Sequence, residues 1–114
     1  MSDALELWLV RHGQTVWNAQ GLVSGWTDVA LSELGEQQGR DLAPYLSQHS
    51  FDGVWASTLQ RAQNTARLAG FEPQTDVRLR ELGFGDLEGA VWETMDPTHR
   101  NALLAFTGFQ APNG

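Results

Sequence analysis

Short apolar segments alternate with segments of helical pattern along this chain, and the alternation limits the folds open to it. Apolar runs at residues 5–10 and 51–56 predict two strands, with Trp8 and Trp55 facing the core, and residues 75–77 predict a third. Helical segments lie between these runs. The order strand, helix, strand, helix predicts an α/β fold with a mostly parallel sheet and right-handed crossovers.

The first helix is predicted to begin after Ser32, whose hydroxyl can accept a hydrogen bond from a free backbone amide of the first turn. Glu33 and Glu36 add negative charge at the positive end of the helix dipole. Pro44 should kink or shorten this helix. The apolar residues near one face are Leu34, Leu42 and Leu46.

The second helix is predicted to have Ser57 as its cap and to end at Gly70. Its inward residues are expected to be Leu59, Ala62, Ala66 and Ala69. Irregular loops are expected at 18–29 and 80–89, and a further helix at 98–106. Functional residues often lie on loops that follow strands or helices, as these two are expected to do.

The run at residues 5–10 ends in Arg11-His12-Gly13, which indicates chemistry at the exit of a strand. In open α/β sheets, ligands bind at the carboxyl ends of the strands. Gly13 lets backbone amides come close to a ligand, and the guanidinium of Arg11 matches the oxygens of a phosphate. The imidazole of His12 is then expected to face an anion site.

Two later residues fit the same edge of the sheet. Arg61 falls in the first turn of a helix that follows a strand, where free amides and the helix dipole already favour an anion. Glu81 lies in a Gly-rich loop, from which a carboxylate could act as a general acid or base. Each residue alone is more often a surface group, so the prediction rests on their combination.

Length, charge and composition limit the kinds of partner that this chain is expected to bind. The 114 residues suffice for one domain, and no apolar run approaches the roughly 20 residues that a membrane helix needs. The net charge of -7 disfavours nucleic acid as a partner. The chain has no cysteine, which excludes disulfides and thiolate chemistry. We therefore expect a soluble, cytoplasmic protein that binds a small anion and neither nucleic acid nor membrane; the oligomeric state stays open.

Together these residues resemble the histidine phosphatase superfamily, the phosphoglycerate mutase-like proteins. The resemblance runs in order from Leu7 to about Gly89, and several separated motifs in register are far more specific than any one of them. It implies a three-layer αβα fold with a mostly parallel sheet. The matching residues are Arg11 to Thr15, Trp17-Asn18, Gly25 to Asp28, Leu31-Ser32, Gly35, Gln38, Ser57, Leu59, Arg61-Ala62, Thr65-Ala66, Leu79, Glu81, Gly85 and Glu88-Gly89.

The resemblance also implies roles. His12 would be the nucleophile that forms a phosphohistidine, with Arg11 and Arg61 holding the phosphoryl oxygens. Glu81 would protonate the leaving alcohol and later deprotonate the attacking water. The family's phosphate pocket is matched by Asn18 and Ser24. No metal or other cofactor is expected.

The chain departs from the family at its end. The family has a second catalytic histidine on a later apolar strand, and the sequence given, which ends at Gly114, has no matching residue. We therefore expect a single histidine phosphatase domain over residues 1–114, incomplete at its C-terminus. The strand implied by the family would lie between the two strands that end at His12 and Ala56.

Three functions remain open at this point. The first is a phosphomonoesterase acting on small phosphorylated metabolites. The second is a phosphoglycerate mutase, suggested by Ser24-Gly25-Trp26, although after Arg80 the sequence has only Arg100 as a further basic residue for a second anionic group. The third is a non-catalytic fragment that binds phosphate esters through Arg11, His12 and Arg61.

Overall fold

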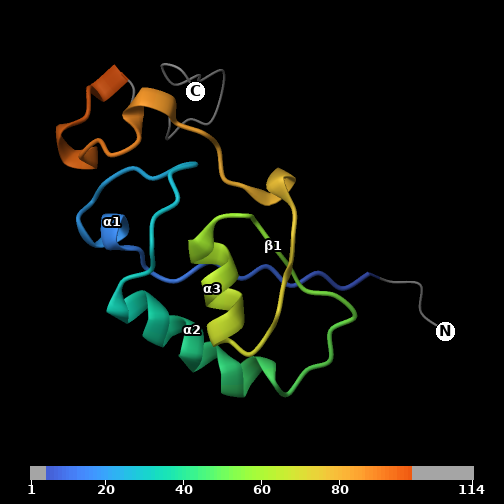
Figure 1. Cartoon of the computed structure of the whole chain (residues 1–114). Helices are drawn as coiled ribbons and strands as arrows, with labels where there is room; N and C mark the ends of the chain where they lie inside the picture. Colours follow the sequence, from blue (N-terminus) through green and yellow to red (C-terminus); the bar gives the residue numbers. More distant parts are fainter. Residues whose placement is uncertain (1–4, 99–114) are drawn as a thin grey trace.

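A computed structural model describes residues 5–98 of the chain (Figure 1). Two helices, α2 (Glu33–Leu46) and α3 (Gln60–Leu68), pack against each other. Strand β1 (Trp55–Ala56) precedes α3 and pairs in parallel with β2 (Gln74–Thr75), which follows α3. This β-α-β unit confirms the predicted parallel connection. The predicted helix at 98–106 lies, from residue 99 on, outside the described residues.

The remaining helical elements are short. Helix α1 (Val16–Ala19) follows the His12 turn and is capped by Thr15. Three 3-10 turns follow β2: η1 (Val77–Leu79), η2 (Gly85–Leu87) and η3 (Trp92–Thr94). None of the helices within residues 5–98 is long and apolar enough to cross a membrane.

Helix α2 begins where the sequence predicted. The Ser32 hydroxyl accepts a hydrogen bond from the Gly35 amide at 3.1 Å, and Leu46 is buried. The expectation that Leu34 lies on the apolar face was wrong, because Leu34 is 54% exposed. The helix continues past Pro44 and ends at Leu46. Because the proline lies in the last turn, it removes a backbone hydrogen bond only near the helix end.

Helix α3 is capped by a distant residue. Ser57 was predicted as the cap, but the N-cap position is Leu59, and the Ser57 hydroxyl accepts the Leu59 amide at 3.2 Å. The Gln60 amide donates instead to Asp28 Oδ1 at 2.7 Å. A loop carboxylate 32 residues earlier in the chain therefore stabilises the positive end of α3.

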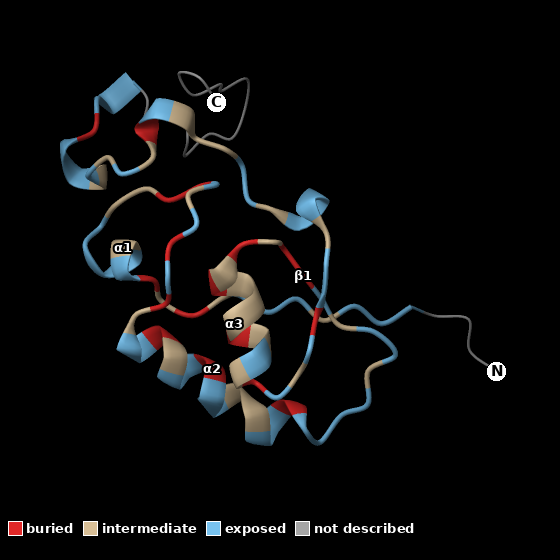
Figure 2. Cartoon of the chain, in the orientation of Figure 1, coloured by how far each residue is buried: buried red, intermediate tan, exposed pale blue. Residues whose placement is uncertain are grey.

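The strands are shorter than predicted. Residues 5–10 form no strand within the described part of the chain, and Leu5 and Leu9 are 89% and 88% exposed (Figure 2). Only the last two residues of the predicted 51–56 strand pair, and Val77, predicted in the third strand, begins η1. A strand needs a hydrogen-bonded neighbour, and apolar pattern alone does not supply one.

About half of the buried residues lie on α2, on α3 and where β1 leads into α3, and the others lie in the loops around these elements (Figure 2). Leu59 and Ala69 are buried at the two ends of α3. The expectation that Trp55 faces the core was wrong, because it is 56% exposed. Trp8 is half-buried, with its ring 4.5 Å from the ring of His49 and edge-on to Phe51.

Candidate active site

The ring of His12 is held at the end of the N-terminal extended segment, which runs past α3 toward α1 (Figure 1). Its Nδ1 lies 2.7 Å from the Gly13 carbonyl oxygen. A carbonyl oxygen accepts but never donates, so the contact is a hydrogen bond only when Nδ1 carries the proton. That tautomer leaves the lone pair on Nε2, which is the state required of a nucleophile.

The turn that carries His12 is fixed to both helices. The Gly13 amide donates to Thr65 Oγ1 of α3 at 3.0 Å, and Thr65 Oγ1 donates to the Arg61 carbonyl at 2.7 Å. On the other side, the Gln14 carbonyl accepts the amide of Ser32, the cap of α2, at 2.9 Å. A buried contact to α3 and a half-buried one to α2 thus tie the candidate nucleophile to the helices.

Arg11, His12 and Asn18 line one cavity of about 910 Å³ between the N-terminal segment and α2. Asn18 also has a structural role, because its Oδ1 accepts the Thr15 amide at 3.0 Å in the capping box of α1. The exposed guanidinium of Arg11 makes no hydrogen bond or ion pair with residues 5–98. Its donors are therefore available to an anion in the cavity.

Arg61 is 2% exposed, and its guanidinium is held by carbonyl oxygens. Nη1 donates to the Thr27 carbonyl at 2.8 Å, and Nη2 donates to the Gly25 carbonyl. Nη2 also lies 3.5 Å from Glu81 Oε2. The guanidinium has five N–H donors, so these contacts fix its plane and direction without using all of them.

The Glu81 loop meets the same guanidinium from the solvent side. The Glu81 side chain is 50% exposed, while its backbone carbonyl accepts the Trp26 indole N–H at 2.6 Å. The guanidinium of Arg80 lies 5.1 Å from the centre of the Trp26 ring, within cation–π range. Trp26 therefore fixes the Glu81 backbone while leaving the carboxylate open to solvent.

The predicted site residues fall into two groups. Arg11, His12 and Asn18 line the cavity, and Arg61 is paired with Glu81. Thr65 connects the groups through the Gly13 amide and the Arg61 carbonyl. Ser24 is buried and does not line the cavity, and its carbonyl accepts the Thr27 amide at 3.1 Å. That all six side chains serve one phosphate site stays a prediction.

Several supporting residues were not predicted in their structural roles. Thr65, Asp28 and Glu88 each hold a segment of the site by a contact spanning 32 to 61 residues of sequence. Their only sequence signal was membership in the motifs of the family resemblance. For metal binding, residues 5–98 contain no group of three or more His, Asp or Glu side chains arranged to hold an ion.

Comparison with known proteins places this site in a family. The histidine phosphatase superfamily (branch 1) matches residues 7–113. The probable phosphoglycerate mutase GpmB of Yersinia enterocolitica is 38% identical over 97 residues, which are 82% of this chain and 45% of the relative. The chain therefore spans about half the length of the curated relatives it matches.

Solved structures agree with that assignment. Phosphoglycerate mutase from Thermus thermophilus superposes with a TM-score of 0.81 at 48% identity, covering 91% of this chain and 59% of that one. A mycobacterial glucosyl-3-phosphoglycerate phosphatase solved with VO3 has a TM-score of 0.73 at 34% identity, covering 83% and 49%. These likenesses confirm the predicted phosphoglycerate mutase-like α/β fold. The chain belongs to the histidine phosphatase superfamily, branch 1.

Proposed function

We propose that the protein containing this chain is a phosphomonoesterase that acts on small phosphorylated metabolites through a phosphohistidine at His12. The observation that carries the proposal is the 2.7 Å contact between His12 Nδ1 and the Gly13 carbonyl oxygen, because the neutral tautomer that makes it a hydrogen bond leaves the lone pair on Nε2. Arg11 and Asn18 line the same cavity and can hold phosphoryl oxygens there.

The chemistry divides into two steps. His12 Nε2 attacks phosphorus, the P–O bond to the alcohol breaks, and Glu81 gives its proton to the departing oxygen. Water then attacks the phosphohistidine, passes a proton to the Glu81 carboxylate, and the N–P bond breaks to release inorganic phosphate. Arg11 and Arg61 offset the negative charge that spreads over the equatorial oxygens.

A phosphoglycerate mutase is the second candidate, and the names of similar proteins favour it. The Yersinia enterocolitica relative is called a probable phosphoglycerate mutase and the Thermus thermophilus protein a phosphoglycerate mutase, whereas the mycobacterial protein is called a glucosyl-3-phosphoglycerate phosphatase. A mutase must also hold a carboxylate and a second phosphate, which requires further cations. Arg80 and Arg100 are the candidates this sequence offers from the Glu81 loop onward.

A direct assay separates the functions. The full gene product is incubated with 3-phosphoglycerate, with and without bisphosphoglycerate, and with p-nitrophenyl phosphate. Phosphate release that needs no bisphosphoglycerate supports the phosphatase, while cofactor-dependent exchange of phosphoglycerate isomers supports the mutase and overturns our first proposal. Binding of inorganic phosphate without either reaction supports the non-catalytic alternative.

Glu81→Gln should lower kcat for alkyl phosphates by about 10²-fold while leaving KM nearly unchanged, because the amide cannot give a proton to the leaving oxygen. p-Nitrophenolate leaves without protonation, so rapid-quench trapping should show phosphoenzyme forming from p-nitrophenyl phosphate at close to the unmodified rate. The matched control is Glu72→Gln, which removes an exposed carboxylate paired with Arg67. Equal losses for both classes of ester would contradict the acid role of Glu81.

A further inference from the structure

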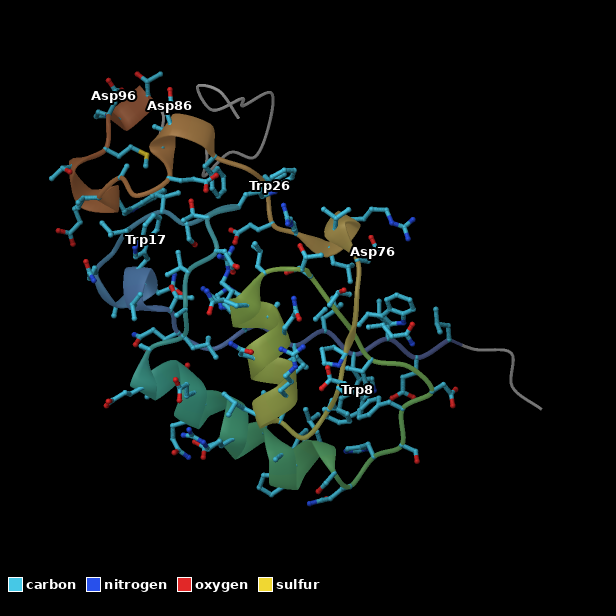
Figure 3. All side chains as sticks on the ribbon, in the orientation of Figure 1. Trp8, Trp17, Trp26, Asp76, Asp86 and Asp96 are labelled. Atoms are coloured by element: carbon cyan, nitrogen blue, oxygen red, sulfur yellow. The ribbon has the colours of Figure 1, made fainter. Side chains whose placement is uncertain are left out.

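The loop at residues 24–28 contacts both members of the Arg61–Glu81 pair. Its Gly25 and Thr27 carbonyls accept the two terminal nitrogens of Arg61. The indole of its Trp26, which is labelled in Figure 3, donates to the Glu81 backbone carbonyl at 2.6 Å. The direction of the guanidinium and the path of the Glu81 loop therefore both depend on the conformation of this loop.

One carboxylate, that of Glu88, anchors this loop. Glu88 Oε1 accepts the Thr27 amide at 2.6 Å and the Thr27 hydroxyl. Glu88 Oε2 accepts the Phe84 amide at 2.9 Å, which joins the 24–28 loop to the segment carrying Glu81. Thr27 thus lies between two charges, with its amide on the Glu88 carboxylate and its carbonyl on the Arg61 guanidinium.

The place that Glu88 occupies depends on Gly25. Gly25 has a φ of +56°, a conformation that favours glycine. A Cβ at this position would lie 2.8 Å from Glu88 Oε2 and 3.0 Å from Glu88 Cδ. Glycine therefore permits both the turn of the loop and the approach of the carboxylate.

Glu88 is ionised in this environment. Its partial burial disfavours the charge, yet hydrogen bonds from the Thr27 hydroxyl and from the backbone amides of Phe84, Trp26 and Thr27 hold the pKa of the carboxyl below its usual value. A carboxylate accepts on both oxygens, whereas a glutamine amide accepts on one and donates on the other. Glutamine would therefore set an N–H donor against the amide of either Thr27 or Phe84.

We propose that Glu88 is a positioning residue: by anchoring the 24–28 loop at Thr27 it sets the direction of the Arg61 guanidinium and the place of Glu81. The kinetic consequence rests on the phosphatase function proposed above. A guanidinium misdirected by about 1 Å can lower turnover by roughly 10²-fold even when the changed residue never touches the substrate.

The test compares Glu88→Gln with Glu93→Gln, which removes an exposed carboxylate from η3. In Glu88→Gln we expect kcat to fall by about 10- to 100-fold with KM changed less than about threefold. Hydrogen exchange of the Arg61 guanidinium protons, followed by NMR, should quicken by at least about tenfold as the Thr27 carbonyl loosens. Glu93→Gln should change neither.

A milder pair keeps the proposal testable if Glu88→Gln fails to fold. Thr27→Ser keeps the hydroxyl donor to Glu88, whereas Thr27→Val keeps the shape and removes the donor. Only the valine variant should lower kcat and quicken Arg61 exchange. Unchanged Arg61 exchange in both Glu88→Gln and Thr27→Val overturns the positioning role, whatever the turnover. An unmodified protein without turnover overturns the phosphatase function instead, and the exchange measurement still decides the role of Glu88.

Discussion

His12→Ala in the full gene product should reduce phosphate release from monoesters by about 10³-fold or more and prevent any phosphoenzyme from forming. The reason is that alanine removes the Nε2 lone pair, and the loss of a covalent nucleophile commonly costs several orders of magnitude in kcat. The measurement is rapid-quench trapping of phosphate transferred from a labelled monoester, since a phosphohistidine is labile in acid and stable in base.

The matched control is His49→Ala. His49 packs its ring 4.5 Å from Trp8 and 5.7 Å from Tyr45, outside the cavity that His12 lines. We expect this variant to lose stability through lost ring contacts and to keep kcat within a few-fold. If His12→Ala retains turnover or still yields an acid-labile phosphoenzyme, the nucleophile is another residue and the proposed mechanism fails.

Local sequence signals predicted where α2 begins and where α3 ends. The Ser32 hydroxyl caps α2, and Gly70, with a φ of +98°, follows the end of α3. A side-chain cap and a C-terminal glycine act within a few residues of the helix end, so the local sequence is enough to predict both. The prediction of a strand at residues 5–10 was wrong, because a strand depends on a neighbouring strand that the local pattern does not specify. Its apolar pattern is real, but no strand within residues 5–98 pairs with it, and its leucines remain exposed.

The sequence predicted which side chains make up the candidate site, but it did not predict the contacts that hold those side chains in place. The histidine after Arg11 and the arginine in the first turn of α3 both follow from motifs and helix electrostatics, whereas the burial of Arg61 does not. The contacts that fix them join segments far apart in sequence, such as Gly13 to Thr65 and Thr27 to Glu88. Nothing in the local pattern of Thr65 or Glu88 distinguishes such a contact from an ordinary surface hydrogen bond.

The His12 turn and α2 approach each other closely at two glycines. Gly13 and Gly35 let two backbones touch: a Cβ on Gly13 would overlap the Gly35 carbonyl oxygen, and a Cβ on Gly35 would overlap the Gln14 carbonyl oxygen. The Gln14 carbonyl is also the acceptor for the Ser32 amide, so the same peptide group helps to cap α2. Neither side can yield by a rotamer change, because both contacts are with backbone atoms.

Gly35→Ala should therefore lower the free energy of unfolding by about 2–4 kcal/mol, although alanine favours a helix over glycine by about 1 kcal/mol. The new Cβ would also lie 2.8 Å from the Gln14 carbonyl carbon and amide nitrogen, so the turn must move away and give up the Ser32 contact. Urea denaturation measures the loss as a lower midpoint at an unchanged slope.

Gly83→Ala is the matched control, since a Cβ there meets the Trp26 ring at ordinary contact distances of 3.5 and 3.6 Å. We expect it to change stability by less than about 1 kcal/mol. Because Gln14 lies two residues after His12, Gly35→Ala should also reduce kcat in the fraction that remains folded. Stability within about 0.5 kcal/mol of the unmodified protein would mean that the turn and α2 separate without loss, and that the helix does not hold His12 in place.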